Sequence, residues 1–421
     1  MDKIKEVLEK QIEEIKPEEE IVERINKVSK DFISDLKKKI KIKKINADIF
    51  IGGSIAKNTL VKKDKYDIDI FVRFDKKYKD NEISSILGKI LGGSAKRIHG
   101  SRDYYNSVKN EIIIEIIPVI KIKSPKEALN VTDLSYFHVN YIVDKLKKNK
   151  KLADEIMLAK SFCFAMDVYG AESYINGFSG YALELLICHY GSFLKFVKEV
   201  AESTEFEKII IDDAGFYKKK ENVLIEVNEA KIQNPIILID PTFKDRNALA
   251  SLSYETYSKF KKACSDFLKH PNSEFFIKKN LFSELNKKYG KELKIITVKT
   301  NKQKGDIAGT KSRKFSSFFI REVRKEFNVK VAEFDYDDVK NIAYVYLVVD
   351  KKPSETIKGP PIINIRGLTA FKKAHANAFI KDAYAHAELK HGLKFEEFMK
   401  IFLKKYKKVI KDMSVMEVKI K

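Results

Sequence analysis

Cysteine is scarce in this sequence, and the scarcity excludes two classes of small scaffold. The 421 residues contain three cysteines, Cys163, Cys188 and Cys264, which stand far apart and form no CxxC pair. A disulfide framework and a zinc ribbon both need closely spaced cysteines, so both are excluded. Each thiol lies in an apolar or helical stretch, which predicts buried structural cysteines in a reducing, cytoplasmic setting.

Long apolar segments are also missing. No stretch approaches the roughly 18 uncharged apolar residues that a membrane-spanning helix needs, so we expect no membrane partner. The opening residues, MDKIKEVLEKQIEEI, form a charged helical pattern without the apolar region of a secretory signal. The glycine-rich Walker loop, GxxxxGK[ST], does not occur, which excludes a nucleotide site of that type.

Length and charge bound what the chain can be. A chain of 421 residues is too long for one ordinary core, so we expect two to four domains. Hydrophobic residues make up 44%, which is enough to build those cores. Lys and Arg number 82 against 60 Asp and Glu, and a net charge of +22 favours a polyanionic partner. The alternative is a lysine-rich composition that only aids solubility.

The first 135 residues predict a small mixed α/β domain. Residues 1–45 have apolar residues at helical spacing and a break near Pro17, which predicts two helices. Three strands are then expected, over residues 47–51, 66–72 and 111–117, and the last is interrupted at Pro118. A turn and a helix start follow the first strand, at Gly52-Gly53-Ser54.

The rest of the chain predicts two further domains, so the fold class is α+β and multidomain. Residues 136–270 are mainly helical, with a β-rich stretch over 208–240 and a long helix that follows Asp240-Pro241-Thr242 and runs to about Leu268. Residues 271–421 predict a split βαβ body with a lysine-rich helical tail from Thr369. The body consists of a strand over 293–298, a helix over 315–327, and strands over 330–334 and 343–349.

The pattern that carries chemistry is GGSIAKNT at residues 52–59, followed by Asp67-Ile68-Asp69. Side chains alternate across a strand, so Asp67 and Asp69 share a face and can hold divalent cations, of which magnesium suits oxygen ligands. The glycines allow close backbone approach, and Ser54 and Lys57 can meet a triphosphate at the following helix start. Each part has an ordinary reading too: a glycine turn before a helix, and a solvated strand edge.

A third carboxylate is expected on a neighbouring strand, because two-metal phosphoryl chemistry needs several oxygen ligands around the reacting phosphate. The run Glu111-Ile-Ile-Ile-Glu115-Ile-Ile-Pro118 offers Glu111 and Glu115 on one face. Glu115 is favoured, because a charge inside an apolar run is costly unless it binds something. An ion pair between Glu115 and a lysine is the alternative.

This arrangement resembles the polymerase-β-like nucleotidyltransferase superfamily and, within it, the archaeal type (class I) of CCA-adding tRNA nucleotidyltransferase. GGSIAKNT…YDIDIFV resembles the nucleotide loop and metal strand of that family, and IIIEIIPVIKI lies where its third carboxylate is found. SYFHVNYI, LAKSFCFAMDVYGAES…GFSGYALELL and IDPTFKDRN resemble later family segments. The resemblance covers about residues 50–250; beyond that it rests on Gly359-Pro360-Pro361.

The resemblance implies roles for ten residues. Asp67, Asp69 and Glu115 fall on the catalytic, metal-binding positions. The nucleotide-binding positions fall on Gly53, Ser54, Lys57, His138, Lys160, Tyr169 and Arg246, of which Arg246 stands where the family recognises the incoming base. Two residues depart from the family pattern: Glu115 replaces an aspartate, and Lys57 replaces an arginine and cannot form a bidentate fork to phosphate.

The implied reaction adds or repairs CCA at the tRNA 3′ end from CTP and ATP without a nucleic-acid template. A terminal 3′-hydroxyl would attack the α-phosphate and release pyrophosphate, with two Mg²⁺ ions. Residues 1–135 would form the catalytic domain, 136–270 a nucleotide- and RNA-binding domain, and 271–421 a tRNA-binding domain for the acceptor arm. A poly(A) polymerase-like enzyme, another relative such as an oligoadenylate synthetase, and a non-catalytic RNA-binding protein remain alternatives. The oligomeric state, homodimer or monomer, stays open.

Overall fold

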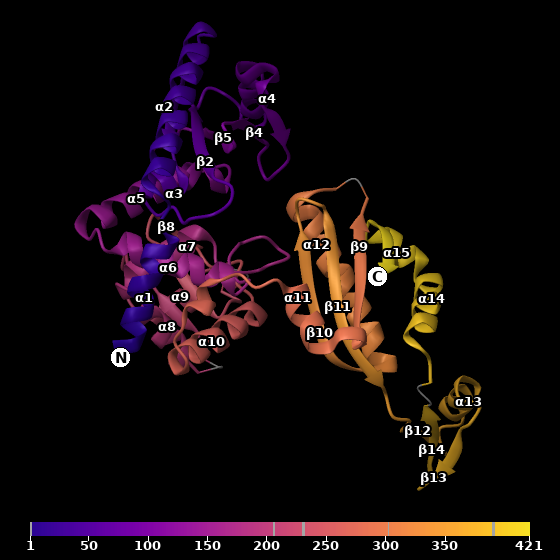
Figure 1. Cartoon of the computed structure of the whole chain (residues 1–421). Coiled ribbons are helices and arrows are strands. Elements are labelled where there is room, and N and C mark those ends of the chain that lie inside the picture. Colours follow the sequence, from indigo (N-terminus) through magenta and orange to yellow (C-terminus); the bar gives the residue numbers. More distant parts are fainter. Residues whose placement is uncertain (1, 205–206, 230–231, 302, 390–391) are drawn as a thin grey trace. The chain divides into compact units, whose positions relative to one another are not determined.

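The computed structural model describes residues 2–204, 207–229, 232–301, 303–389 and 392–421 (Figure 1). The chain divides into two compact units, residues 1–278 and residues 279–421. Each unit has hydrophobic core clusters of its own. No helix among the described residues is both long enough and apolar enough to cross a bilayer.

Unit 1 begins with two helices and a five-stranded sheet, which we call the head sheet. The helices are α1 (Asp2–Ile15) and α2 (Glu19–Ile42), with the predicted break at Pro17 between them. The strands of the head sheet, in spatial order, are β1 (Ala47–Ile51), β2 (Asp67–Phe74), β5 (Ile112–Ile120), β4 (Tyr104–Lys109) and β3 (Lys96–Ile98). The β2 and β5 strands are parallel and the other pairs antiparallel, so the sheet is mixed, as expected.

One face of the head sheet is buried and the other carries the carboxylates. Ile68, Ile70 and Val72 on β2 are fully buried and join a hydrophobic core with residues of α2 and of α4 (Asp80–Leu91). Because side chains alternate along β2, Asp67 and Asp69 face the opposite side. The short helix α3 (Gly53–Lys57), which contacts β2 and α5, begins directly after β1.

The predicted interruption of the third strand at Pro118 is wrong, since β5 continues to Ile120. Odd-numbered residues of β5 direct their N–H groups toward β2, as the bonds from Ile113 to Tyr66 and from Lys121 to Phe74 establish. Pro118 therefore faces the side of β4, and the β4 pairing has already ended at Ile116. A proline is tolerated there because no ladder hydrogen bond requires its missing N–H.

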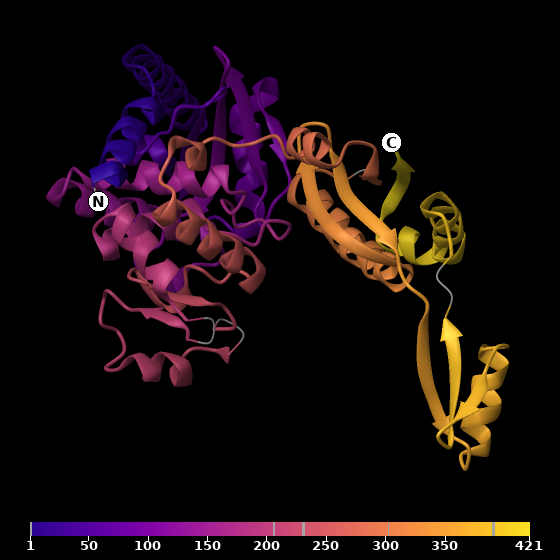
Figure 2. The same cartoon turned by 60° about the horizontal axis from the view of Figure 1, so that its bottom comes forward.

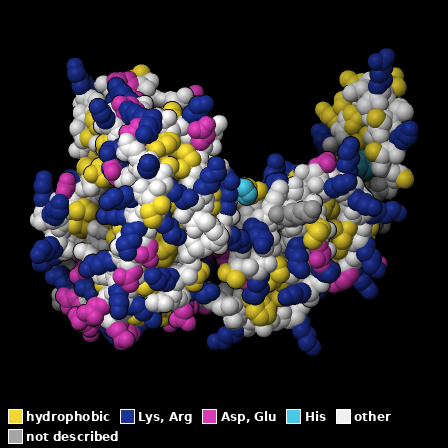
Figure 3. Space-filling model, turned by 90° about the horizontal axis from the view of Figure 1, so that it is seen from above, with side chains coloured by type: hydrophobic (Ala, Val, Ile, Leu, Met, Phe, Trp, Pro, Cys, Tyr) yellow, Lys and Arg dark blue, Asp and Glu magenta, His cyan; other side chains and the backbone are white. Residues whose placement is uncertain are grey.

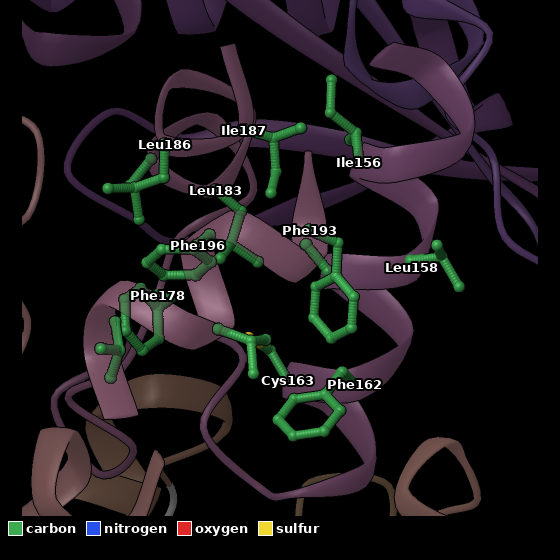
Figure 4. Close-up of a cluster of buried hydrophobic side chains, with 14 of the residues drawn as sticks. Ile156, Leu158, Phe162, Cys163, Phe178, Leu183, Leu186, Ile187, Phe193 and Phe196 are labelled. Carbon is green, nitrogen blue, oxygen red and sulfur yellow. The ribbon is translucent and has the colours of Figure 1, made fainter. Parts of the chain in front are cut away.

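The middle of unit 1 is the expected helical assembly, and its core is rich in phenylalanine. Phe162, Phe178, Phe193 and Phe196 are fully buried and pack among aliphatic side chains (Figure 4). Leu8 of α1 joins this core too. The helices are α5 (Ser135–Lys148), α6 (Leu152–Ala165), α7 (Gly180–Tyr190), α8 (Phe193–Glu202) and α10 (Tyr254–Lys269).

The segment between α8 and α10 differs from the prediction. It holds a three-stranded sheet of β6 (Ile209–Ile211), β7 (Ile236–Asp240) and β8 (Phe243–Asn247), and also the unpredicted helix α9 (Lys220–Glu226). The expected helix does not begin after Asp240. The Asp240 carboxylate accepts hydrogen bonds from the Thr242 amide and hydroxyl, which closes a tight turn into β8. The α10 helix begins only at Tyr254, where the Ser253 hydroxyl caps it.

Unit 2 contains the predicted split βαβ body (Figures 1 and 2). The β9 strand (Leu293–Thr300) leads through α12 (Gly305–Glu326) to β10 (Phe327–Asp337), and β11 (Ile342–Lys351) lies between the two strands. The prediction of a helical tail is only partly right. The tail has helices α13 (Ile365–Ala374), α14 (Phe395–Lys405) and α15 (Lys407–Asp412). It also has strands that were not predicted, β13 (Phe379–Lys381) and β14 (Tyr384–Leu389), which form a small sheet with β12 (Glu355–Pro361), and β15 (Val415–Ile420), which extends the main sheet beside β9.

The α11 helix (Leu281–Tyr289) completes unit 2. The β15 strand pairs with β9, more than 110 residues earlier in the sequence, which a local pattern does not reveal. The β13 and β14 strands form a local hairpin through Asp382 and Ala383, whose positive φ values are not typical of these residues. Lysine and arginine side chains are spread over the visible surface, as the net charge of +22 requires (Figure 3). Cys163 and Cys264 are buried, Cys188 is half-buried, and all three are free thiols.

Candidate active site

Three carboxylates share one face of the head sheet. Asp67 and Asp69 are two residues apart on β2, so both side chains point to the same side. The parallel pairing of β2 with β5 places Glu115 directly opposite Asp69. Paired residues of neighbouring strands share a face, so Glu115 joins the two aspartates.

Glu111 and Glu115, the two candidates for the third carboxylate, lie in different surroundings. Asn110 and Glu111 both have positive φ, 50° and 63°, and form the two-residue turn between β4 and β5. Glu111 is therefore exposed and outside the strand, whereas Glu115 is half-buried within it. Within the described residues, Glu115 forms no ion pair with a lysine, so the structural alternative proposed for it is not observed.

Burial and neighbouring negative charge raise the pKa values of Asp69 and Glu115. Burial, followed by the negative charge of Asp67, raises the pKa of Asp69 to about 6. Burial, followed by the charges of Asp69 and Asp67, raises the pKa of Glu115 to about 7. Mutual repulsion of this kind is what a bound cation would relieve. The Asp67 carboxylate contacts the Lys63 ammonium. Among the described residues, no three metal-ligating side chains are close enough to hold one ion as they stand.

Gly53 brings the start of α3 against Asp69. Its φ is +59°, a conformation that suits glycine, and a Cβ atom built on it would lie 1.8 Å from Asp69 Oδ2. Any side chain at this position would therefore occupy the space of the carboxylate. Ser54 follows in the same helix and is half-buried. The glycine predicted from the sequence is thus required by close approach as well as by the turn.

Lys57 and Lys160 meet at one buried carboxylate that the sequence analysis missed. Lys57 Nζ lies 2.7 Å from Glu184 Oε2, and Lys160 Nζ lies 2.9 Å from Glu184 Oε1. Lys160 also donates to the Thr59 hydroxyl at 2.9 Å. Glu184 stands in the apolar run ALELLI, and the cost of a charge in such a run, used above for Glu115, would have indicated it.

Tyr169 lies beside this group. It is half-buried, and burial, followed by the negative charges of Glu184 and Asp67, raises the pKa of its phenol. A Cβ built on Gly180 would lie 2.9 Å from its hydroxyl oxygen, so a larger residue there would displace the phenol hydroxyl. The positive charges of Lys57 and Lys160 offset part of the rise in the pKa of Asp69. The phenol, the two lysines and the carboxylates therefore form one electrostatic neighbourhood.

His138 and Arg246 meet at a second buried carboxylate, Asp240. Arg246 Nη1 lies 2.7 Å from Asp240 Oδ2, and His138 Nε2 lies 2.9 Å from the same oxygen. The Tyr181 hydroxyl donates to Asp240 Oδ1, and its ring stacks on His138 with centroids 4.0 Å apart. Burial lowers the pKa of His138. The close contact of Asp240 with His138, together with Arg246 and Thr242, outweighs burial and holds the pKa of Asp240 below its usual value.

Arg246 lies on β8, so its predicted place at the head of a helix is wrong. Asp240 holds Arg246 in an ion pair, and because Asp240 is fully buried this is not an ordinary surface pair. About a quarter of the arginine side chain remains exposed. It lines a cavity of about 440 Å³ together with residues of the 128–134 loop, Ser179 and the 243–251 segment.

Comparison with known proteins gives this site its context. Residues 29–152 match the family described as nucleotidyltransferase domain, and residues 154–277 match the family described as tRNA nucleotidyltransferase, second domain. The CCA-adding enzyme of Nanoarchaeum equitans is 34% identical over 341 residues, 80% of this chain and 81% of that protein. The chain belongs to the family of archaeal CCA-adding enzymes.

The CCA-adding enzyme of Methanocaldococcus jannaschii is 31% identical over 409 residues, 92% of this chain and 89% of that protein. The CCA-adding enzyme of Pyrococcus abyssi is 28% identical over 395 residues, 88% of this chain and 83% of that protein. The family resemblance drawn from the sequence motifs is therefore confirmed.

The fold itself is shared more widely than this CCA-adding enzyme family. A solved structure of a cytoplasmic RNA terminal U-transferase is 12% identical, with a TM-score of 0.51, and covers 67% of this chain and 100% of that chain. A structure of Cid1, described as having RNA terminal uridylyl transferase activity, is 13% identical with a TM-score of 0.51, and covers 66% of this chain and 99% of that chain. The nucleotidyltransferase head expected from the sequence is thus confirmed as a fold. Nucleotidyltransferases of this superfamily generally use divalent metal ions.

Proposed function

We propose that this protein adds or repairs the CCA sequence at the 3′ end of tRNA, using CTP and ATP and no nucleic-acid template. The observation that carries the proposal is the register of β2 with β5. It sets Glu115 opposite Asp69, with Asp67 on the same face, and Gly53 holds the start of α3 against them. The CCA-adding relatives supply the substrate class.

Asp67, Asp69 and Glu115 are the residues that would hold two Mg²⁺ ions. Carboxylate oxygens suit this cation, and the raised pKa values of Asp69 and Glu115 fit a site in which positive charge is missing. When bound, the ions would supply a hydroxyl of lowered pKa and neutralise charge on the phosphates. The tRNA 3′-oxygen forms a bond to the α-phosphorus, the bond to the β-phosphate oxygen breaks, and pyrophosphate leaves.

The protein's own residues orient the nucleotide. Lys57 and Lys160 would meet the triphosphate by charge, and Ser54 and Tyr169 by hydroxyl donors. Arg246 would read the incoming base with guanidinium donors, held by Asp240 at the edge of the 440 Å³ cavity. His138 shares that carboxylate and would support the same wall of the nucleotide site.

We assign catalysis to residues 1–135, nucleotide and RNA contacts to 136–270, and grip on the acceptor arm to 271–421. The lysine-rich composition supports the last assignment, because A-form RNA is held mainly through phosphates and shape. Three free cysteines fit a reducing compartment, and we propose the cytoplasm as the place of reaction.

The test is incubation with tRNA that lacks its three terminal nucleotides, with Mg²⁺ and with CTP and ATP supplied separately and together. CTP alone should extend the tRNA by two nucleotides, and both together by three. Intact tRNA is the control and should not be extended. Repeated addition from ATP alone would identify a poly(A) polymerase-like enzyme instead, and tRNA binding without addition would identify a non-catalytic protein.

A further inference from the structure

Glu184 is an almost completely buried carboxylate that contacts two cations at once. Its side chain is 2% exposed, and those of Lys57 and Lys160 are 8% and 10% exposed. Each carboxylate oxygen takes one ammonium group, at 2.7 Å and 2.9 Å. Burying a carboxylate is expensive unless it is paired in this way, so the contacts explain how the charge is tolerated in α7.

The three side chains come from different parts of unit 1. Lys57 ends α3 beside the head sheet, Lys160 lies in α6, and Glu184 lies in α7. Lys57 and Glu184 are 127 residues apart in the sequence. The single carboxylate therefore fixes the spacing of two ammonium groups that the head and the central helices contribute separately.

Two buried ammonium groups would not stay together unaided. Like charges repel, and burial disfavours each charge, so burial and the nearby Lys57 lower the pKa of Lys160. The Glu184 charge opposes both effects on Lys160, and its two oxygens hold the two ammonium groups close together. With one negative and two positive charges, the group retains an unbalanced positive charge that an anionic ligand can neutralise.

We propose that Glu184 is a positioning residue for the triphosphate: it holds the ammonium groups of Lys57 and Lys160 at a fixed spacing without touching the nucleotide. This inference rests on the proposed role of the two lysines. Glu184 itself is a poor phosphate contact, because it is buried and carries the same sign of charge. It acts through the lysines, and its effect is confined to the phosphate end of CTP or ATP.

Glu184→Gln removes the charge and keeps the shape. The glutamine oxygen can accept from one lysine, but its NH₂ group faces the other ammonium with a donor, so that lysine turns away. Losing a hydrogen bond to a charged group should weaken nucleotide binding. The KM for CTP and the KM for ATP should therefore both rise roughly 10- to 100-fold, by a similar factor. The kcat should change less than about fivefold, because the lost contacts bind the ground state and the transition state alike. The affinity for tRNA should not change.

Glu155→Gln is the matched control. Glu155 is a half-buried carboxylate on α6 that accepts a hydrogen bond from the Phe193 amide at 2.7 Å. Glutamine can accept the same bond, so this variant should keep the KM values of the native protein. The melting temperature of both variants should be measured alongside, so that loss of folding is recognised.

Direct binding separates this inference from the proposed function. Equilibrium binding of CTP and of CMP, with Mg²⁺, is measured for the native chain, for Glu184→Gln and for Glu184→Asp, whose shorter arm keeps the charge. CTP binding should weaken roughly 10- to 100-fold in Glu184→Gln and less in Glu184→Asp, with CMP binding unchanged. The CTP effect of Glu184→Gln should also shrink in a Lys160→Met background.

Equal weakening of CTP and CMP, or full additivity with Lys160→Met, would overturn the positioning role. Native CTP affinity in Glu184→Gln would do the same. Failure of the native protein to extend tRNA would instead refute the proposed function, and the difference between CTP and CMP would still decide the role of Glu184.

Discussion

The contact between Gly53 and Asp69 allows one prediction to be worked out from distances. In Gly53→Ala, the new Cβ would lie 1.8 Å from Asp69 Oδ2 and 2.9 Å from its Cγ atom. Ordinary contact begins near 3.4 Å, so the carboxylate must retreat by about 1.6 Å. The φ of +59° adds a second cost, because alanine disfavours this backbone conformation.

The two costs affect different measurements. The positive φ should lower the free energy of unfolding by about 1–2 kcal/mol. Displacing a metal-binding carboxylate by more than 1 Å should lower kcat at least roughly 100-fold, since misplacements of about 1 Å have effects of this size. That factor corresponds to about 2.7 kcal/mol in the activation free energy. CTP addition to shortened tRNA and urea unfolding measure the two quantities.

Gly191→Ala supplies the control. Gly191 has a φ of +77° at the end of α7, and nothing lies within 4 Å of a Cβ built there. This variant should lose similar stability and keep its activity. If Gly53→Ala retains kcat within threefold of the native value, or if Gly191→Ala is equally inactive, then the approach of α3 to Asp69 does not govern the site.

Further outcomes are expected from the same geometry. Asp69→Ala should abolish nucleotide addition in Mg²⁺ while leaving tRNA binding in a gel-shift assay nearly intact; near-normal incorporation would contradict its role. Glu115→Ala should be inactive and Glu115→Asp should retain much activity, whereas Glu111→Ala, in an exposed turn, should add nucleotides normally. Arg246→Ala should disturb the CTP/ATP preference or slow both additions, and normal rate and fidelity would place base choice elsewhere. The dissociation constant for tRNA should rise at least roughly tenfold between 50 and 200 mM salt, because bound lysines displace counterions; a constant value would refute an electrostatic grip.

Local patterns were sufficient to predict the elements whose signals are local. The break at Pro17, the strand around Asp67 and the split βαβ body all follow from periodicity and from turn residues. Pro118 was misread because its effect depends on where β4 ends, which is a property of the sheet rather than of the strand. The β8 strand was missed because a single carboxylate, Asp240, closes the turn before it.

Some residues of the candidate site could likewise be predicted from local patterns, and others could not. Alternation along β2 was enough to place Asp67 and Asp69 on one face. The choice of Glu115 over Glu111 depends on the register between β2 and β5 and on the hairpin turn before β5. The isoleucine-rich sequence around the two glutamates predicts neither of them. The partners of Glu184 could be found only in the structure, since they lie 24 and 127 residues away in the sequence.

The position of α1 has a consequence for how the chain acquires its structure during synthesis. Leu8 and Ile15 are buried in the core of the central helices, where α1 packs on α6, whereas α2 belongs to the core of the head sheet. A ribosome makes α1 well over a hundred residues before α6, so its apolar stripe stays uncovered while the head is being completed. The apolar side chains of α1 therefore remain exposed to solvent during the early steps of folding. A fragment that ends with the head would expose the same side chains and would be prone to aggregation. Folding of unit 1 is therefore complete only when α6 has been made and covers α1.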